Sequence, residues 1–169
     1  MAEFKGFAGG VSKSQYSPQR LKNHFDNGVF ALSCGKVAEA YLYFLESDQK
    51  ECAVLYNMAV CFYMSENYEK ALSYLDGALR LLPVLPPKTV TVPEELERYE
   101  AQNDGYKAAM MMDTPELYPE RCRISILRLK ADILYAMGNT QELYKILPAL
   151  SGRNYRNIEL IKSEINKEV

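Results

Sequence analysis

The chain has 169 residues, of which 48% are hydrophobic and 25% are charged, and its formal net charge is −2. This length and composition are typical of one globular domain that buries its own core. The slightly acidic balance argues against binding to nucleic acid or to an anionic membrane surface, because both need concentrated positive charge. No apolar run approaches the roughly 20 residues that span a bilayer. Residues 1–16 lack the long apolar stretch of a signal peptide, so we expect a flexible leader on a cytoplasmic protein.

Cysteine and histidine are too few and too scattered to predict a metal site. The chain has a single histidine, His24, and no two cysteines form a CxxC pair. We therefore expect no metal and no cofactor, and we expect the cysteines to be reduced thiols that pack as small core residues. The four cysteines are Cys34, Cys52, Cys61 and Cys122.

Apolar residues at helical spacing predict four helices in the first half of the chain. Ser17 followed by Pro18 is a good N-cap and first-turn pair for the first of them. Gly35 interrupts the pattern after that helix, and Pro83 ends the last one. The predicted helices span residues 18–34, 37–48, 52–65 and 68–82.

The middle of the chain has a different composition, rich in proline. Residues 83–95, PVLPPKTVTVPEE, contain four prolines, which predict an extended connector because proline removes a helix donor. For residues 93–112 the pattern favours a short helix, an Asn-Asp-Gly turn and a second short helix. The alternative is one loop with a helical patch.

The last part of the chain is again helical in pattern. A long helix is expected to begin at Thr114-Pro115 or Tyr118-Pro119 and to end near residues 137–139. Another begins near Thr140 and is cut or kinked by Pro148. Residues 154–167 form a final amphipathic helix, whose apolar side carries Ile158, Ile161 and Ile165. No convincing strand pattern is present; the alternation in KTVTV is short and isolated.

Residues 52–83 resemble a tetratricopeptide repeat, a helix–turn–helix unit of about 34 residues. Small residues at Ala59 and Ala71 suit the close approach of two antiparallel helices, and large residues fill the gaps beside them. The residues that match the family pattern are Leu55, Met58, Ala59, Phe62, Tyr68, Ala71, Leu75, Ala78 and Pro83.

Two further units resemble the same family. In residues 20–51, Gly28, Gly35, Ala40 and Phe44 take the expected slots and His24 takes the slot of the large residue, whereas Asn27 and Ser47 depart from the pattern. Residues 118–150 match more loosely, through Leu127, Ala131, Leu134 and Gly138, and their second helix contains Pro148. The resemblance implies an all-α fold, a right-handed superhelix of helical hairpins in a single domain over residues 17–169. Residues 84–117 would form an insert of about one repeat, or a degenerate repeat, and residues 154–167 a capping helix.

In this family a concave groove lined by the first helix of each unit holds a peptide or a helix of another protein. Carried onto this chain, the groove would be an aromatic and aliphatic trough with a polar end. Its residues would be Phe25, Val29, Leu32, Tyr56, Val60, Tyr63, Met64, Arg128, Asp132 and Tyr135. Family members that grip the acidic tail of a heat-shock chaperone use Lys and Asn on these faces; here Phe25, Val29 and Val60 stand instead, which argues against that role.

Other interpretations of the same residues stay open. The groove residues could be covered by the insert, with AAMMM at residues 108–112 as a plug, or by a second copy of the chain in a homodimer. The chain is also similar in size and composition to cytosolic chaperones built on this repeat. Catalysis is not expected: His24 and Cys34 lie almost three helical turns apart, and no phosphate-binding glycine loop is present. The cluster of Arg121, Arg123, Arg128 and Lys130 is diluted by acids, although it could mark where an acidic segment docks.

Overall fold

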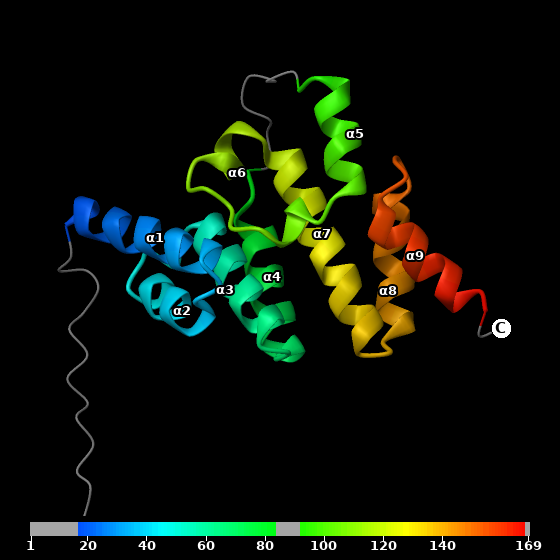
Figure 1. Ribbon diagram of the computed structural model, residues 1–169, viewed down its shortest axis with the longest axis horizontal. Coiled ribbons are helices and arrows are strands. Elements are labelled where there is room, and N and C mark those ends of the chain that lie inside the picture. The colour runs from blue at the N-terminus through cyan, green and yellow to red at the C-terminus, as the bar shows by residue number, and fades with distance from the viewer. Residues whose placement is uncertain (1–16, 84–91, 168–169) are drawn as a thin grey trace, which may run out of the picture.

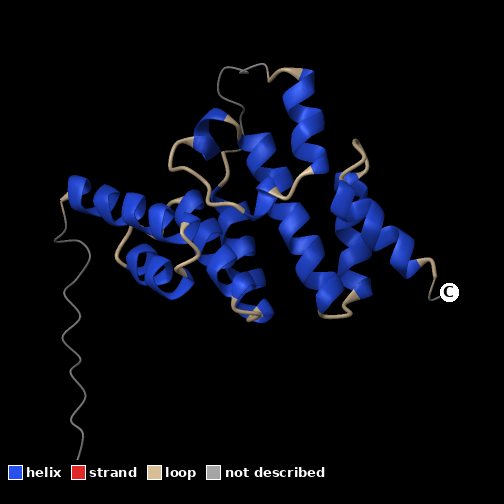
Figure 2. Cartoon of the chain, in the orientation of Figure 1, coloured by secondary structure: helices blue, strands red, loops and turns tan. Residues whose placement is uncertain are grey.

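The computed structural model describes residues 17–83 and 92–167, and every regular element in these two stretches is helical (Figures 1 and 2). The all-α prediction is confirmed. The leader, and the predicted connector apart from its ends, lie outside the described residues. The α-helices are α1 (Pro18–Ser33), α2 (Val37–Leu45), α3 (Cys52–Met64), α4 (Tyr68–Leu81), α5 (Glu94–Gln102), α6 (Thr114–Leu117), α7 (Pro119–Ala136), α8 (Thr140–Ile146) and α9 (Arg156–Ile165), with 3₁₀ turns η2 (Gly105–Lys107) and η3 (Leu147–Leu150).

Consecutive helices pack in pairs, α1 with α2, α3 with α4 and α7 with α8. The pairs also contact one another in chain order, because α2 packs on α3 and α4 packs on α7. Helix α9 lies against α7 near the C-terminal end of the molecule, and α5 contacts α9 (Figure 1). The units at residues 20–50 and 52–83 therefore lie side by side.

Close approach between paired helices depends on residues with little or no side chain. A Cβ added at Gly28 of α1 would lie 2.6 Å from the ring of Phe44 in α2, and one at Gly77 of α4 would lie 2.9 Å from Leu55 in α3. Both distances are shorter than a carbon–carbon contact allows, so the close packing of these two helix pairs requires glycine at positions 28 and 77. The alanines expected at helix contacts are completely buried: Ala40, Ala59, Ala71 and Ala78.

Polar caps and glycine turns set the helix boundaries. The side chain of Ser17 accepts a hydrogen bond from the backbone N–H of Arg20 at the start of α1, as the Ser-Pro pair predicted. After α1 and after α7 the chain turns at Gly35 and Gly138, whose φ angles are 73° and 67°. A side chain at either position would be strained, which explains why glycine follows both helices.

The start of the long helix differs in detail from the prediction, whereas the end of α8 agrees with it. Both expected starts are used, because α6 begins at Thr114, just before Pro115, and α7 begins at Pro119. Tyr118 lies between the two helices at φ −138° and ψ 57°. A residue before proline avoids helical backbone, so the helix breaks there. Helix α8 ends at Ile146, just before the 3₁₀ turn that contains Pro148, as expected.

Within residues 93–112, the first predicted helix is present as α5, but the prediction of a second α-helix is wrong. After Asn103 and Asp104 the chain makes the short turn η2 and then runs without helix through residues 108–111. The reason is tertiary: the backbone of Met110 is hydrogen bonded to the side chain of Asn57 in α3, and a helical backbone could not offer both of its groups to one side chain.

Three of the four cysteines are buried, as expected, and the fourth is not. Cys52, Cys61 and Cys122 lie in the core, and burial raises the pKa of each thiol to about 12. These thiols stay protonated near neutral pH and are poor nucleophiles. Cys34 lies at the exposed end of α1.

Gly28→Ala is expected to destabilise the chain, because the new methyl group would overlap the buried ring of Phe44. Overpacking of this kind costs about 1 to 3 kcal/mol in the free energy of unfolding, which urea unfolding measures. Gly105→Ala is the matched control, since its added Cβ meets nothing within 4 Å. Equal stability of the two variants would contradict close packing between α1 and α2.

Thiol labelling should separate Cys34 from the three buried cysteines. In the native protein at about pH 8, a disulfide reagent is expected to modify Cys34 rapidly, whereas the buried, protonated thiols react only after unfolding. Cys34→Ser should abolish the rapid phase. A second thiol that reacts as fast as Cys34 would contradict the placement of the others in the core.

Candidate functional site

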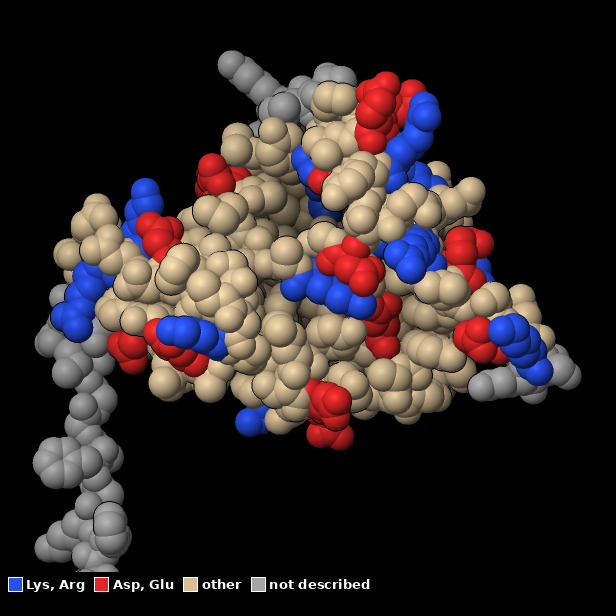
Figure 3. Space-filling model, viewed as in Figure 1, with Lys and Arg blue, Asp and Glu red and all other residues tan. Residues whose placement is uncertain are grey.

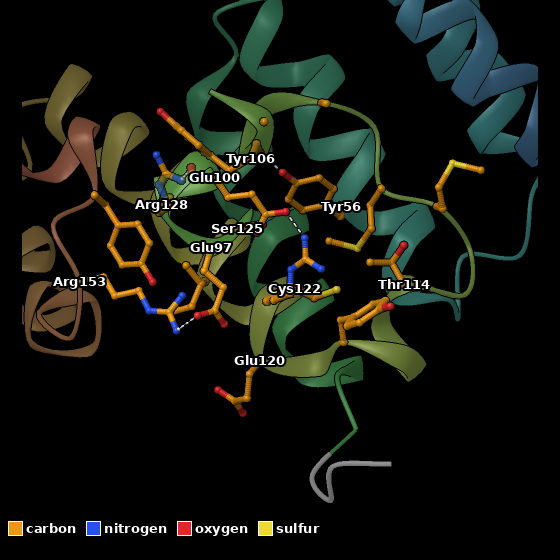
Figure 4. Close-up of a pocket in the computed structure, with 18 of the residues that line it drawn as sticks. Tyr56, Glu97, Glu100, Tyr106, Thr114, Glu120, Cys122, Ser125, Arg128 and Arg153 are labelled. Atoms are coloured by element: carbon orange, nitrogen blue, oxygen red, sulfur yellow. Dashed lines mark hydrogen bonds and ion pairs between the residues drawn. The ribbon is translucent and has the colours of Figure 1, made fainter. Parts of the chain in front are cut away.

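A cavity of 530 Å³ lies between α5, the segment 103–113, the first half of α7 and the turn that precedes α9 (Figure 4). The segment 103–113 joins α5 to α6 and contains η2. In the figure, the side chains of Tyr56, Cys122 and Thr114 lie on one side of the opening and those of Glu97 and Arg153 on the other. The other lining residues are Glu100, Gly105, Tyr106, Ala108, Ala109, Met110, Met111, Tyr118, Glu120, Arg121, Ile124, Ser125, Arg128, Ala149, Gly152 and Tyr155.

One wall of the cavity is the segment 103–113 itself, which two buried side chains of α3 hold. The hydroxyl of Tyr56 donates to the carbonyl of Tyr106. The amide of Asn57 donates to the Met110 carbonyl at 2.9 Å and accepts from the Met110 N–H at 2.7 Å. Asn57 is the only residue of α3 with a side-chain amide, and it is buried. A buried amide needs hydrogen-bond partners, and the backbone of Met110 supplies them.

Arg128 of α7 holds the other end of the segment. Its guanidinium lies between two aromatic rings, 4.0 Å from the ring centre of Tyr106 and 5.0 Å from that of Tyr155. It donates to the backbone carbonyls of Glu100, Ala101 and Asn103 at 2.8, 3.4 and 3.1 Å. These carbonyls end α5, where a cation is favourable because the helix dipole is negative there.

Arg128 is also the link to α9. Its Nε donates to the side chain of Asn157 at 2.9 Å. Only 3% of the residue is exposed, and burial lowers the pKa of its guanidinium, an effect that Tyr106, Tyr155 and Asp132 oppose. One buried cation therefore joins α5, α7 and α9 through hydrogen bonds to carbonyls and an amide.

Asp132 lies one helical turn after Arg128, and its carboxylate interacts with three donor side chains. It accepts from the Tyr106 hydroxyl at 2.6 Å and from Asn157 at 2.8 Å, and its carboxylate lies 3.1 Å from the ammonium of Lys107. Burial and the hydrogen bond to Asp132 raise the pKa of Tyr106. Burial lowers the pKa of Lys107, but Asp132, Tyr63 and Asp104 together outweigh burial, so the pKa lies above its ordinary value. Tyr106 is neutral and Lys107 charged near neutral pH.

The charged side chains that line the cavity are paired within the chain. Arg121 bonds to Glu100, Arg153 lies 2.7 Å from Glu97, and Glu120 lies 3.5 Å from Arg123. Lys130, the last member of the basic cluster seen in the sequence, lies 2.6 Å from Asp76. Figure 3 agrees with this pattern, because Lys and Arg lie interspersed with Asp and Glu on the face it shows.

The structure brings together four of the predicted groove residues. Tyr56 and Tyr63 of α3 and Arg128 and Asp132 of α7 surround η2, and the ammonium of Lys107 lies 5.7 Å from the ring centre of Tyr63. These residues face the segment 103–113. This agrees with the alternative in which the insert covers the groove residues. Tyr56 and Arg128 are buried by it, so their contacts are within the chain.

The other six predicted groove residues are either packed in the core or exposed. Phe25 is completely buried, with its ring 5.9 Å from that of Phe44, so it packs inside the first helix pair. Leu32 and Val60 are also buried, and Val29 is half-buried in the same core. Met64 and Tyr135 are 50% and 37% exposed. Their contact with a partner stays a prediction.

Sequence reasoning did not single out Asn57, Tyr106 or Asn157, which hold the segment and α9 in place. Asn57 did carry a signal, since a lone amide on an apolar helix predicts a buried hydrogen bond. The side chains of Asn157 and Tyr106 carried no such signal, because their hydrogen-bond partners lie 25 residues or more away in the chain.

Comparisons of this chain with family models, curated proteins and solved structures gave no match. No group of His, Cys, Asp and Glu in the described part of the chain could hold a metal ion. Within the same residues, none of the helices has the length and apolar character needed to cross a bilayer.

Asn57→Ala should loosen the segment 103–113, because it leaves the buried N–H and C=O of Met110 without partners. We expect a loss of about 2 to 4 kcal/mol in the free energy of unfolding, from two unsatisfied groups, measured in urea. Trypsin should also cleave faster after Lys107. Asn154→Ala, on an exposed turn, is the control and should change neither measurement. Unchanged cleavage in Asn57→Ala would contradict the role of Asn57.

Proposed function

We propose that this chain is a binding scaffold that holds an extended segment of another protein, without catalysis, in the cavity beside the segment 103–113. The helix pairs would form a tetratricopeptide-like array, in which α3 and α7 supply the inner face. The pairing of α1 with α2, α3 with α4 and α7 with α8, and their contact in chain order, support this arrangement.

The main support for the proposal is that side chains of α3 form hydrogen bonds with the backbone of the segment 103–113. Asn57 pairs with both backbone groups of Met110, and Tyr56 binds the carbonyl of Tyr106. Such contacts recognise polypeptide through its main chain, as peptide-binding grooves do. The inner face is therefore suited to an extended chain, and the insert occupies only part of it.

The cavity leaves room for a further segment. Its 530 Å³ lies within the usual range of ligand pockets, about 300 to 1,000 Å³. Its walls combine apolar side chains, such as Met110 and Ile124, with aromatic ones, such as Tyr118. Aromatic and methionine side chains provide large contact areas that adapt to different guests.

Ala108→Glu tests the site, because it places an unpaired carboxylate on an exposed position of the cavity wall. Proteins captured from the native cell by the unaltered chain, and identified by mass spectrometry, should be lost or reduced about tenfold with this variant, since burying an unpaired charge costs more than 1.4 kcal/mol.

Ala38→Glu is the matched control, since it places the same charge on the exposed start of α2, away from the cavity. It should retain the captured proteins. If Ala108→Glu retains all of them while both variants stay folded by circular dichroism, the cavity is not the binding site. Light scattering would identify a second copy of the chain as the guest.

A further inference from the structure

The hydrogen bonds of Asn57 define the backbone conformation of Met110. The N–H and the C=O of one residue point to the same side only in extended backbone, and both of these groups of Met110 bond to Asn57. Met110 is therefore extended. The described residues contain no cis peptide bond, and a trans peptide directs its C=O and N–H in opposite directions. Hence the Ala109 carbonyl and the Met111 N–H both point away from α3.

These two groups form a short unpaired strand edge. Within the described part of the chain, neither the Ala109 carbonyl nor the Met111 N–H takes part in a hydrogen bond, and Met111 is 51% exposed. The carbonyl of Met111 accepts from the N–H of Thr114 at 3.2 Å, so the edge ends where α6 begins. An acceptor and a donor on one side of an extended segment match the groups of an added strand.

The edge and the cavity fit one guest. In a sheet, side chains at the same level of neighbouring strands point to the same face. Since the side chain of Met110 lines the cavity, a residue paired beside it would direct its own side chain into that cavity. The guest's charge follows from the lining: Arg121, Arg153 and Glu120 already have ionic partners. A charged guest would lose its hydration there without a counter-ion.

We propose that the edge at residues 109–111 binds an uncharged, extended peptide segment of a partner protein by strand addition, with an apolar side chain of that segment in the cavity. This proposal rests on the proposed function and deepens it, since it names the chemistry of the guest and the backbone groups that hold it. Main-chain hydrogen bonds supply the orientation, and the cavity selects the side chain.

Met111→Pro and Met111→Ala form the decisive pair of variants. Proline removes the N–H that the added strand needs, and it suits a preceding residue in extended backbone, as Met110 is. Alanine removes the same side chain and keeps the N–H. Both retain the carbonyl that Thr114 uses.

The probe is a set of fluorescent peptides of about eight residues, the length of an ordinary strand, with blocked ends and only Ala, Val, Leu, Met, Thr and Tyr. Binding is measured by fluorescence anisotropy. Met111→Ala is the reference, because it also lacks the Met111 side chain at the cavity wall. Peptides should bind Met111→Pro about tenfold more weakly than Met111→Ala, as expected for the loss of a main-chain hydrogen bond. Equal affinity for the two variants, or no binding by any peptide of this composition, would overturn the proposal.

A second measurement does not depend on how Met111→Pro folds. Single N-methylation along a binding peptide should weaken its affinity for the unaltered chain at one residue only, because the edge offers one acceptor, the Ala109 carbonyl, to one N–H of the added strand. A uniform effect along the peptide would refute strand addition. If Ala108→Glu still loses cellular partners in that case, the proposed function survives while this inference fails.

Discussion

Backbone that is buried without regular structure must take its hydrogen bonds from side chains, and this constraint shapes the centre of the molecule. The segment 103–113 lies between α3 and α7, and its own turns pair only some of its polar groups. Tyr56 and Asn57 bind the backbone of Tyr106 and Met110 from one side, and Arg128 binds the carbonyl of Asn103 from the other. Because Arg128 also bonds to Asn157 of α9, the same set of contacts positions the C-terminal helix.

The arrangement has a consequence for the arginines. In the sequence, Arg121, Arg123, Arg128 and Lys130 form a basic cluster that could attract an acidic partner. In the folded chain each has an internal partner, and Arg128 is turned inward onto carbonyls and aromatic rings. Arg121, Arg128 and Lys130 therefore join α7 to other helices, while Arg123 is paired within α7. The cavity that the cluster borders is electrically balanced.

The inner face also accounts for the composition of α3. Tyr56, Val60 and Tyr63 recur at spacings of four and three residues, so they share one face of the helix. On an isolated pair of helices this face would be an open apolar surface, but the segment 103–113 covers part of it. What stays accessible is the cavity beside that segment and the outward edge of the segment itself.

The helices were predictable from local information, and the cover over them was not. Periodic apolar residues, Ser17 before Pro18, and glycines after α1 and α7 act within a few residues, so their effect on helix type and boundaries can be recognised in the chain. The second helix expected between residues 106 and 112 is absent because Asn57, more than 50 residues earlier, binds the backbone of Met110 in an extended conformation. Burial of Tyr56 and Arg128 likewise depends on which distant segment meets them. Local propensity thus determines the helical framework, whereas hydrogen bonds between distant residues decide which part of its inner face remains open.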